Sequence, residues 1–309
     1  MKTLNGVGAV PADWPDSAVS IGKFDGVHAG HRKVIAELKS LAERDGLAAV
    51  VVTFDRHPLA LLSPADCPTA LVSVNQKLEL LAETGIDATL VLEFNEALSS
   101  LPPEEFIGSI LVNALRAKRV LVGSDFRFGA RGAGDVALLQ QRGKTLGFEV
   151  HVIDDVKPDN EHRVSSTWIR QLLSDGDIPA ASALLGHIPT VRGVVVHGAA
   201  RGRELGYPTA NLSPESEGLI PADGVYAGWL TDAGTRYPAA ISVGNNPTFE
   251  GVPQKQVEAY VLDEDIDLYG HVVDVSFVER IRGMVAFTGI DPLIEQIADD
   301  VTRVRAILA

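Results

Sequence analysis

The N-terminal half of the chain alternates short apolar runs with longer amphipathic stretches. Five apolar runs of strand length cover residues 19–22, 48–54, 88–93, 119–123 and 149–153. Stretches with the apolar spacing of a helix lie between them, at residues 31–44, 74–84, 103–115 and 135–146. Strands that alternate with helices in this way predict an α/β fold, with a parallel sheet and helices on both of its faces. Ligands of such sheets bind beyond the carboxyl ends of the strands, so motifs that directly follow a strand carry extra weight.

The pattern changes in the C-terminal half. Two more helices are expected at 165–175 and 177–185, the second with Asp177 as its N-cap. Five strand-like runs then follow without helices between them, at residues 191–196, 224–230, 237–243, 256–262 and 271–278. Successive strands predict a small antiparallel β-barrel or sandwich, and an amphipathic stretch at 291–309 predicts a terminal helix. We therefore expect two domains, residues 1–186 and 187–309.

Composition narrows the classes of protein. A chain of 309 residues with 46% hydrophobic and 22% charged residues is globular. The net charge of −14 argues against a nucleic-acid partner, because phosphate backbones bind basic surfaces. Cys67 is the only cysteine, so a reducing, cytoplasmic setting is expected, and a loop or packing role for it is favoured over catalysis. No stretch resembles a signal peptide or a membrane span, so we expect neither export nor a membrane partner. None of these features indicates an oligomeric state.

The strongest local signal is Gly-Lys-Phe-Asp-Gly-Val-His-Ala-Gly-His at residues 22–31, which leaves the first strand and opens the first helix. Its glycines let the backbone approach a phosphate, and a helix start offers free N–H groups. His28 and His31 are three residues apart and can donate hydrogen bonds to one ligand. A zinc site is the alternative, but it needs a third ligand that no nearby Cys or Glu supplies. A structural glycine turn is the other alternative, and the combined pattern favours a nucleotide.

A second element follows the last strand of this half. Arg-Val-Ser-Ser-Thr-Trp-Ile-Arg at residues 163–170 opens a helix. Hydroxyl groups and an arginine at a helix start suit the phosphates of a leaving pyrophosphate. Taken alone, the segment is better explained as an ordinary Ser/Thr cap with a solvated arginine. The two elements together support the nucleotide site more strongly than either does alone.

These two motifs resemble the FMN adenylyltransferase module of bacterial bifunctional riboflavin kinase/FAD synthetases, within the wider His-x-Gly-His nucleotidyltransferase group of Rossmann-like domains. Residues 53–58 (Thr-Phe-Asp-Arg-His-Pro) and 122–129 (Val-Gly-Ser-Asp-Phe-Arg-Phe-Gly) match the same family, although relatives often carry proline in place of Arg56. The resemblance implies that ATP is bound by Gly22, Phe24, Asp25, Gly26, His28, Gly30, His31, Asp125, Arg163, Ser166 and Thr167. It implies a flavin near Phe54, His57, Pro58, Phe126 and Phe128. Core packing is the rival interpretation for the three phenylalanines.

The C-terminal half carries an independent motif at residues 197–211, which follows a strand and is rich in glycine and arginine. From the residues alone it is equally a phosphate-binding loop or a structural turn. Thr209 and Asn211 offer two neutral oxygen ligands of the kind that Mg²⁺ accepts. Pro-Thr-Ala-Asn at 208–211 resembles the signature of flavokinase modules, and residues 224–227 and 267–270 fit the same family.

This second resemblance implies a small β-barrel kinase domain. It implies that ATP is bound by Gly198, Arg201, Gly202, Thr209 and Asn211. It also implies Mg²⁺ at Thr209 and Asn211, and Glu258 as the catalytic carboxylate. A solvent-facing strand charge is the alternative for Glu258, and Asn245 stands where the family is expected to carry threonine.

Together the resemblances imply synthesis of FAD from riboflavin in two ATP-dependent steps. In the first, Glu258 would accept the proton of the riboflavin hydroxyl as the γ-phosphoryl group of ATP is transferred, giving FMN. In the second, the FMN phosphate would attack a second ATP, with positioning and charge stabilisation by His28, His31, Arg163, Ser166 and Thr167. Two alternatives stay open. One is a nucleotidyltransferase for a pantetheine or nicotinamide precursor, and the other is a flavin-sensing protein without turnover.

Overall fold

The computed structural model describes residues 1–153, 163–198, 205–245 and 255–309. They form two compact units that divide between Ser165 and Ser166. The predicted helices at 165–175 and 177–185 therefore pack with the second unit. The boundary predicted near residue 187 was meant to separate the residues of the two activities, not the two packed units, and it stays a prediction.

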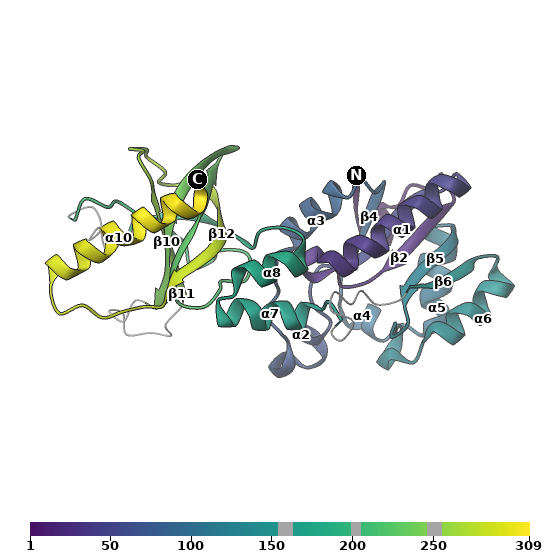
Figure 1. The fold of residues 1–309 in the computed structure, drawn as a ribbon. Coiled ribbons are helices and arrows are strands. Elements are labelled where there is room, and N and C mark those ends of the chain that lie inside the picture. Colours follow the sequence, from purple (N-terminus) through teal and green to yellow (C-terminus); the bar gives the residue numbers. More distant parts are fainter. Residues whose placement is uncertain (154–162, 199–204, 246–254) are drawn as a thin grey trace. The chain divides into compact units, whose positions relative to one another are not determined.

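A parallel six-stranded sheet forms the centre of the first unit, in the order β1-β4-β3-β2-β5-β6 (Figure 1). Its strands are β1 (Lys2–Asn5), β2 (Ser17–Ile21), β3 (Ala48–Phe54), β4 (Ala88–Leu92), β5 (Ala117–Gly123) and β6 (Glu149–Ile153). The predicted α/β fold with a parallel sheet is thus confirmed. Strand β1 was not predicted, because only Leu4 of its four residues is buried and no apolar run marks it.

Helices cover both faces of this sheet. The α-helices of this unit are α1 (Ala29–Asp45), α2 (Leu59–Leu62), α3 (Val74–Glu83), α4 (Glu96–Ser99), α5 (Pro103–Phe106) and α6 (Val136–Leu146). Alternate residues of a strand point to opposite faces, so Val50 and Val52 join one core cluster while Ala49 and Val51 join another. The first cluster includes Leu139 of α6, and the second includes residues of α1 and α3.

One predicted helix differs in detail. The stretch 103–115 was expected to be a single α-helix, but it begins as α5 and continues as a π-helix over Ile107–Ala114. The amide of Leu115 bonds to the carbonyl oxygen of Ile110 at 3.0 Å, five residues back. Apolar spacing alone does not distinguish this wider turn from an α-helix, because both bury one face.

The second unit contains a closed antiparallel barrel in the strand order β10-β11-β8-β7-β12-β9. Its strands are β7 (Thr190–Val196), β8 (Ala210–Leu212), β9 (Gly224–Asp232), β10 (Thr235–Asn245), β11 (Lys255–Val261) and β12 (Val272–Arg282). The predicted barrel is confirmed. Strand β8 was not predicted, because three residues directly after a Pro-Thr pair are too short a run to show a period.

The described residues of this second unit include three helices, which are α7 (Ser166–Asp175), α8 (Ile178–Leu185) and α10 (Ile290–Leu308). Asp177 caps α8 as predicted, accepting a hydrogen bond from the amide of Ala180 at 3.1 Å. The terminal helix α10 buries Val304 against the barrel. Its Asp300, only 3% exposed, accepts hydrogen bonds from Arg282 of β12 at 2.7–3.0 Å. No helix among the described residues is long and apolar enough to cross a membrane.

Candidate functional sites in the two units

The loop between β2 and α1 brings the two histidines of the first motif into contact. His28 precedes the first turn of α1, and its Nδ1 accepts a hydrogen bond from the amide of His31 at 3.4 Å. The two imidazole rings stack, with centroids 3.7 Å apart and planes inclined by 14°. A Cβ atom added to Gly30 would lie 3.1–3.2 Å from the His28 ring, so this position favours the absence of a side chain.

Both imidazoles are neutral at physiological pH. Burial lowers the pKa of His28 to about 4, and the positive charge of Arg163 adds to that effect. Burial also lowers the pKa of His31, followed by the charges of His28 and Lys23. Because Nδ1 of His28 accepts a hydrogen bond, its proton resides on Nε2, which can donate to a ligand. Nδ1 of His31 is buried and has no hydrogen-bond partner among the described residues.

Arg163 and Asp125 form an ion pair beside these rings. A nitrogen of Arg163 lies 2.8 Å from a carboxylate oxygen of Asp125, and this hydrogen bond lowers the pKa of Asp125. Asp125 follows β5 and His28 follows β2, which are neighbouring strands, so the carboxyl ends of the sheet carry both. Ser166 and Thr167 begin α7 in the second unit, so their predicted role with the histidines stays a prediction.

The remaining predicted nucleotide residues shape the loop. Phe24 and Gly26 adopt left-handed backbone angles, with φ of 50° and 77°. Phe24 is only 2% exposed, and its ring centroid lies 5.1 Å from that of His31. The buried Phe24 ring therefore packs against the His31 ring. Asp25 accepts a hydrogen bond from the amide of Leu71 at 2.9 Å. A Cβ atom on Gly22 would lie 3.1 Å from the Phe24 ring.

The aromatic residues predicted near the flavin mostly pack in the core. Phe128 is 6% exposed and stacks on Phe126 with a centroid distance of 5.4 Å. Phe54 is partly buried and contacts Phe94 edge-on at 5.5 Å. Phe128 therefore packs in the core, and the flavin contacts of all five residues stay predictions. His57 and Pro58 follow β3 and are half-buried, and Nδ1 of His57 accepts a hydrogen bond from the Leu59 amide at 3.1 Å.

Strands β8 and β11 assemble the second site. Asn211 and Glu258 are direct partners in the antiparallel register. Glu258 alternates with buried Val257 and Ala259, so its carboxylate lies on the outer face of the barrel wall. The hydroxyl of Thr209 lies 3.5 Å from a carboxylate oxygen of Glu258. The side-chain NH₂ group of Asn211 donates a hydrogen bond of 3.1 Å to the carbonyl oxygen of Thr209.

This donor set fits a small hard cation. The NH₂ group of Asn211 is turned toward Thr209, which leaves the amide oxygen of Asn211 as a ligand atom. A hydroxyl and an amide oxygen beside one carboxylate are ligands that Mg²⁺ accepts while it keeps waters and phosphates. Gly198 is required here, because an added Cβ atom would lie 2.5 Å from the Asn211 side chain. Arg201, Gly202 and residues 246–249 lie outside the described part of the chain, and the side chain of Asn245 is likewise not described.

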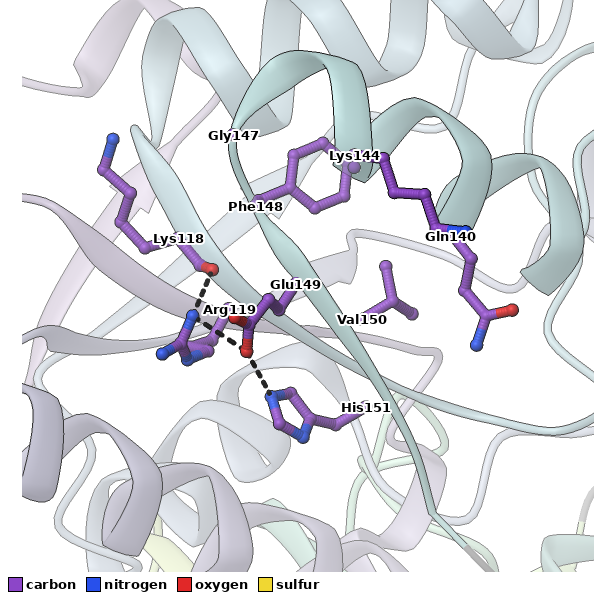
Figure 2. Close-up of a pocket in the computed structure, with 10 residues that line it drawn as sticks. Lys118, Arg119, Gln140, Lys144, Gly147, Phe148, Glu149, Val150 and His151 are labelled. Carbon is purple, nitrogen blue, oxygen red and sulfur yellow. Dashed lines mark hydrogen bonds and ion pairs between the residues drawn. The ribbon is translucent and has the colours of Figure 1, made fainter.

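Two other observations bear on the alternatives. Within the described ranges, no group of three His, Cys, Asp or Glu side chains could hold a metal ion. A cavity of about 670 Å³ lies at the opposite end of the first unit's sheet from the histidines, beside the starts of β5 and β6. Figure 2 shows an ion pair between Arg119 and Glu149, whose atoms lie 3.1 Å apart. Nε2 of His151 lies 3.8 Å from the same carboxylate oxygen of Glu149. Ligands of parallel sheets bind at the carboxyl ends of the strands, so we place the chemistry with the histidines and not in this cavity.

Sequence reasoning missed Lys77, a buried lysine of α3 that lies near the first site. The signal was available, because Lys77 stands four residues before the fully buried Leu81 and thus on the core-facing side of an amphipathic helix. A charged residue in that position needs a buried partner.

Comparisons with known proteins match each half of the chain to a family model. The family model for FAD synthetase matches residues 10–168, and the model for riboflavin kinase matches residues 185–308. The bifunctional riboflavin kinase/FMN adenylyltransferase of Escherichia coli K12 is 37% identical over 99% of this chain and 97% of its own length. The enzyme of the same name from Bacillus subtilis is 34% identical over 92% of this chain and 90% of its own length.

A solved structure shares the whole fold. A Streptococcus pneumoniae chain described as a macrolide-efflux protein superposes with a TM-score of 0.89, at 33% identity and over 99% of both chains. The two family models occur here in one chain, in the order that their motifs predict, and the full-length relatives carry both activities in their name. The chain therefore belongs to the bifunctional riboflavin kinase/FMN adenylyltransferase family.

Proposed function

We infer that this chain makes FAD from riboflavin in two ATP-dependent steps, with one step in each unit. The observation that carries the inference is the presence of two separate sites. One has two stacked neutral histidines beside an arginine–aspartate pair, and the other has a Thr–Asn–Glu cluster on a barrel wall. The family models for FAD synthetase at residues 10–168 and for riboflavin kinase at residues 185–308 support the proposal that the first site carries adenylyl transfer and the second carries riboflavin phosphorylation.

In the kinase step, Glu258 accepts the proton of the riboflavin hydroxyl as that oxygen attacks the γ-phosphorus of ATP. The hydroxyl of Thr209 orients the carboxylate by a hydrogen bond. Thr209 and Asn211 would hold Mg²⁺, which when bound offsets phosphate charge. Gly198 keeps space for the Asn211 side chain.

In the adenylyl step, the FMN phosphate is already an anionic nucleophile and needs no strong base. The Nε2–H group of His28 is free to donate a hydrogen bond toward a phosphate because Nδ1 is held by the start of α1. His31 stacks on that ring and keeps it in place. Arg163 would leave Asp125 to contact the pyrophosphate that departs, and Ser166 and Thr167 would add hydroxyl donors.

Incubation with riboflavin, ATP and Mg²⁺, followed by chromatography, tests the proposal. The expected products are FMN, FAD, ADP and pyrophosphate, and supplied FMN should yield FAD and pyrophosphate without ADP. Riboflavin that is bound but unchanged would identify a flavin-binding protein without turnover. The reaction partners are then flavins and ATP, and a cytoplasmic setting, suggested by the single cysteine, belongs to the same proposal.

A further inference from the structure

Lys77 is a buried cation near the adenylyl site that the mechanism above does not use. It lies in the first turn of α3 and is 8% exposed. Its ammonium group donates a hydrogen bond of 2.8 Å to the carbonyl oxygen of Phe54 and one of 3.4 Å to that of Lys23. Both acceptors are main-chain atoms, so a side chain of α3 joins two separate loops.

The two loops are those that carry the predicted substrate contacts. Lys23 belongs to the segment that ends in the histidine pair, and Phe54 ends β3 just before the predicted flavin residues His57 and Pro58. The hydroxyl of Thr53 also donates to the carbonyl oxygen of Lys23, at 3.1 Å. The nucleotide loop and the flavin segment therefore share one small hydrogen-bond network with the ammonium group of Lys77 at its centre.

The charged groups around Lys77 come from each element packed against it. Asp25 from the nucleotide loop and Asp55 from the end of β3 both favour the charged ammonium. Arg56 forms an ion pair with Asp55, at 3.1 Å. His31 of α1 responds to Lys77, since the ammonium charge helps to lower the imidazole pKa. A buried lysine costs stability, and an apolar residue of similar length fills the same volume without that cost.

We propose that Lys77 is a positioning residue of adenylyl transfer, which fixes the spacing between the nucleotide loop and the flavin segment through the carbonyl groups of Lys23 and Phe54. The proposal rests on the adenylyl activity inferred above. Spacing matters because the FMN phosphate and the α-phosphorus must meet at reacting distance, and a shift of about 1 Å can cost on the order of 10²-fold in rate.

The ammonium charge also gives the network a pH dependence. Burial lowers the pKa of Lys77 to about 8, against the raising effect of Asp25 and Asp55. Hydrogen bonds from a charged donor are roughly twice as strong as neutral ones, so loss of the proton weakens the link between the loops. Adenylyl transfer should therefore lose activity as the pH rises through about 8, and kcat/KM reports this group in the free enzyme.

The chain offers a matched control in Lys39. Its ammonium group also donates to a main-chain carbonyl of the same unit, that of Thr84 at 2.8 Å, but Thr84 caps the far end of α3. Lys39→Met removes the same kind of bond away from both loops. The test measures FAD formation from FMN and FMN formation from riboflavin in the full-length wild type, Lys77→Met, Lys77→Gln and Lys39→Met.

We expect Lys77→Met to lower kcat/KM for FMN by about 10- to 100-fold, with most of the loss in kcat, and to abolish the alkaline fall in activity. Lys77→Gln keeps a neutral donor, so it should be impaired less and should also lack the alkaline fall. Lys39→Met and the riboflavin kinase step should match the wild type. If Lys77→Met does not fold, Lys77→Gln decides by the same two readouts.

Three results would overturn the proposal. FAD formation by Lys77→Met within twofold of wild type would remove the positioning role. An equal loss of FAD formation in Lys39→Met would show that the loss reflects lower stability of the unit and not the position of Lys77. An alkaline fall that persists unchanged in both Lys77 variants would assign that titration to another group. Failure of the wild type to make FAD from FMN would instead refute the proposed function, which keeps the two failures distinct.

Discussion

Replacing His28 by asparagine tests whether the first site is held together by neutral imidazoles. The pKa of His28 is lowered from 6.5 to about 4 in the folded chain. As the pH falls, the unfolded chain therefore takes up a proton before the folded one does. The stability that this group contributes is complete above about pH 6.5 and is lost as the pH falls towards 4.

The magnitude follows from the two pKa values. Between pH 7 and pH 5, titration of His28 alone lowers the free energy of unfolding by about 2 kcal/mol. In His28→Asn the amide oxygen still accepts the hydrogen bond of the His31 amide, because asparagine is a favoured N-cap. The variant should keep the start of α1 and lose only the titration.

Urea unfolding at pH 7 and pH 5 measures the difference. Trp14 is buried in the first unit and reports on it when Trp168 and Trp229 of the second unit are replaced by phenylalanine. Between the two pH values, His28→Asn should lose about 2 kcal/mol less stability than its parent. His187 lies in the second unit, so His187→Asn serves as a control. It should leave the unfolding transition followed by Trp14 fluorescence unchanged. Equal losses in parent and His28→Asn would refute the reasoning.

Four further expectations separate the two chemistries. Glu258→Gln should lower riboflavin phosphorylation by about 10²–10⁴-fold and spare FAD formation from FMN, as followed by chromatography of the flavins. His31→Ala should do the reverse, with a loss on the order of 10²–10³-fold, and a variant that still makes FAD normally would remove His31 from the site. Chelation of Mg²⁺ should stop both steps. In a titration of rate against Mg²⁺, Asn211→Leu should raise the Mg²⁺ concentration needed for the kinase step alone. A fragment of residues 166–309 should phosphorylate riboflavin and melt at a higher temperature by circular dichroism than a fragment of residues 187–309, because α7 and α8 pack in the second unit.

The central strands of both units were predictable because burial marks them. Strands such as β3 and β4 are apolar except for one threonine each, since both faces of the parallel sheet are covered by helices. The short strands β1 and β8 were not, because their place is decided by partners distant in the chain. Lys2–Asn5 pairs with β4, more than eighty residues away, and nothing in four residues encodes that pairing.

The site was predictable where glycines and histidines are fixed by spacing along the chain. His28 is the N-cap of α1 and His31 lies three residues later in its first turn, so the spacing in the sequence places both rings at the start of the helix, where they stack. The core position of Phe128 was not predictable, because a flavin contact and a core position favour the same aromatic ring and only tertiary packing shows that Phe128 joins a core cluster. The core-facing position of Lys77 could be predicted from its spacing to Leu81, but its two hydrogen-bond acceptors could not, because the carbonyl groups of Lys23 and Phe54 meet α3 only in the fold.

The two units differ in how they end their sheets. The barrel closes on itself, so each of its strands has two neighbours, whereas in the described part of the chain β1 and β6 of the parallel sheet each pair with one strand. Open edges are templates for chain-to-chain pairing, which charged side chains discourage. Exposed Glu149 begins β6, and exposed Lys2 begins β1. We therefore expect these charges to discourage aggregation through the open edges of the sheet. Substitutions that neutralise them should lower solubility before they lower either activity.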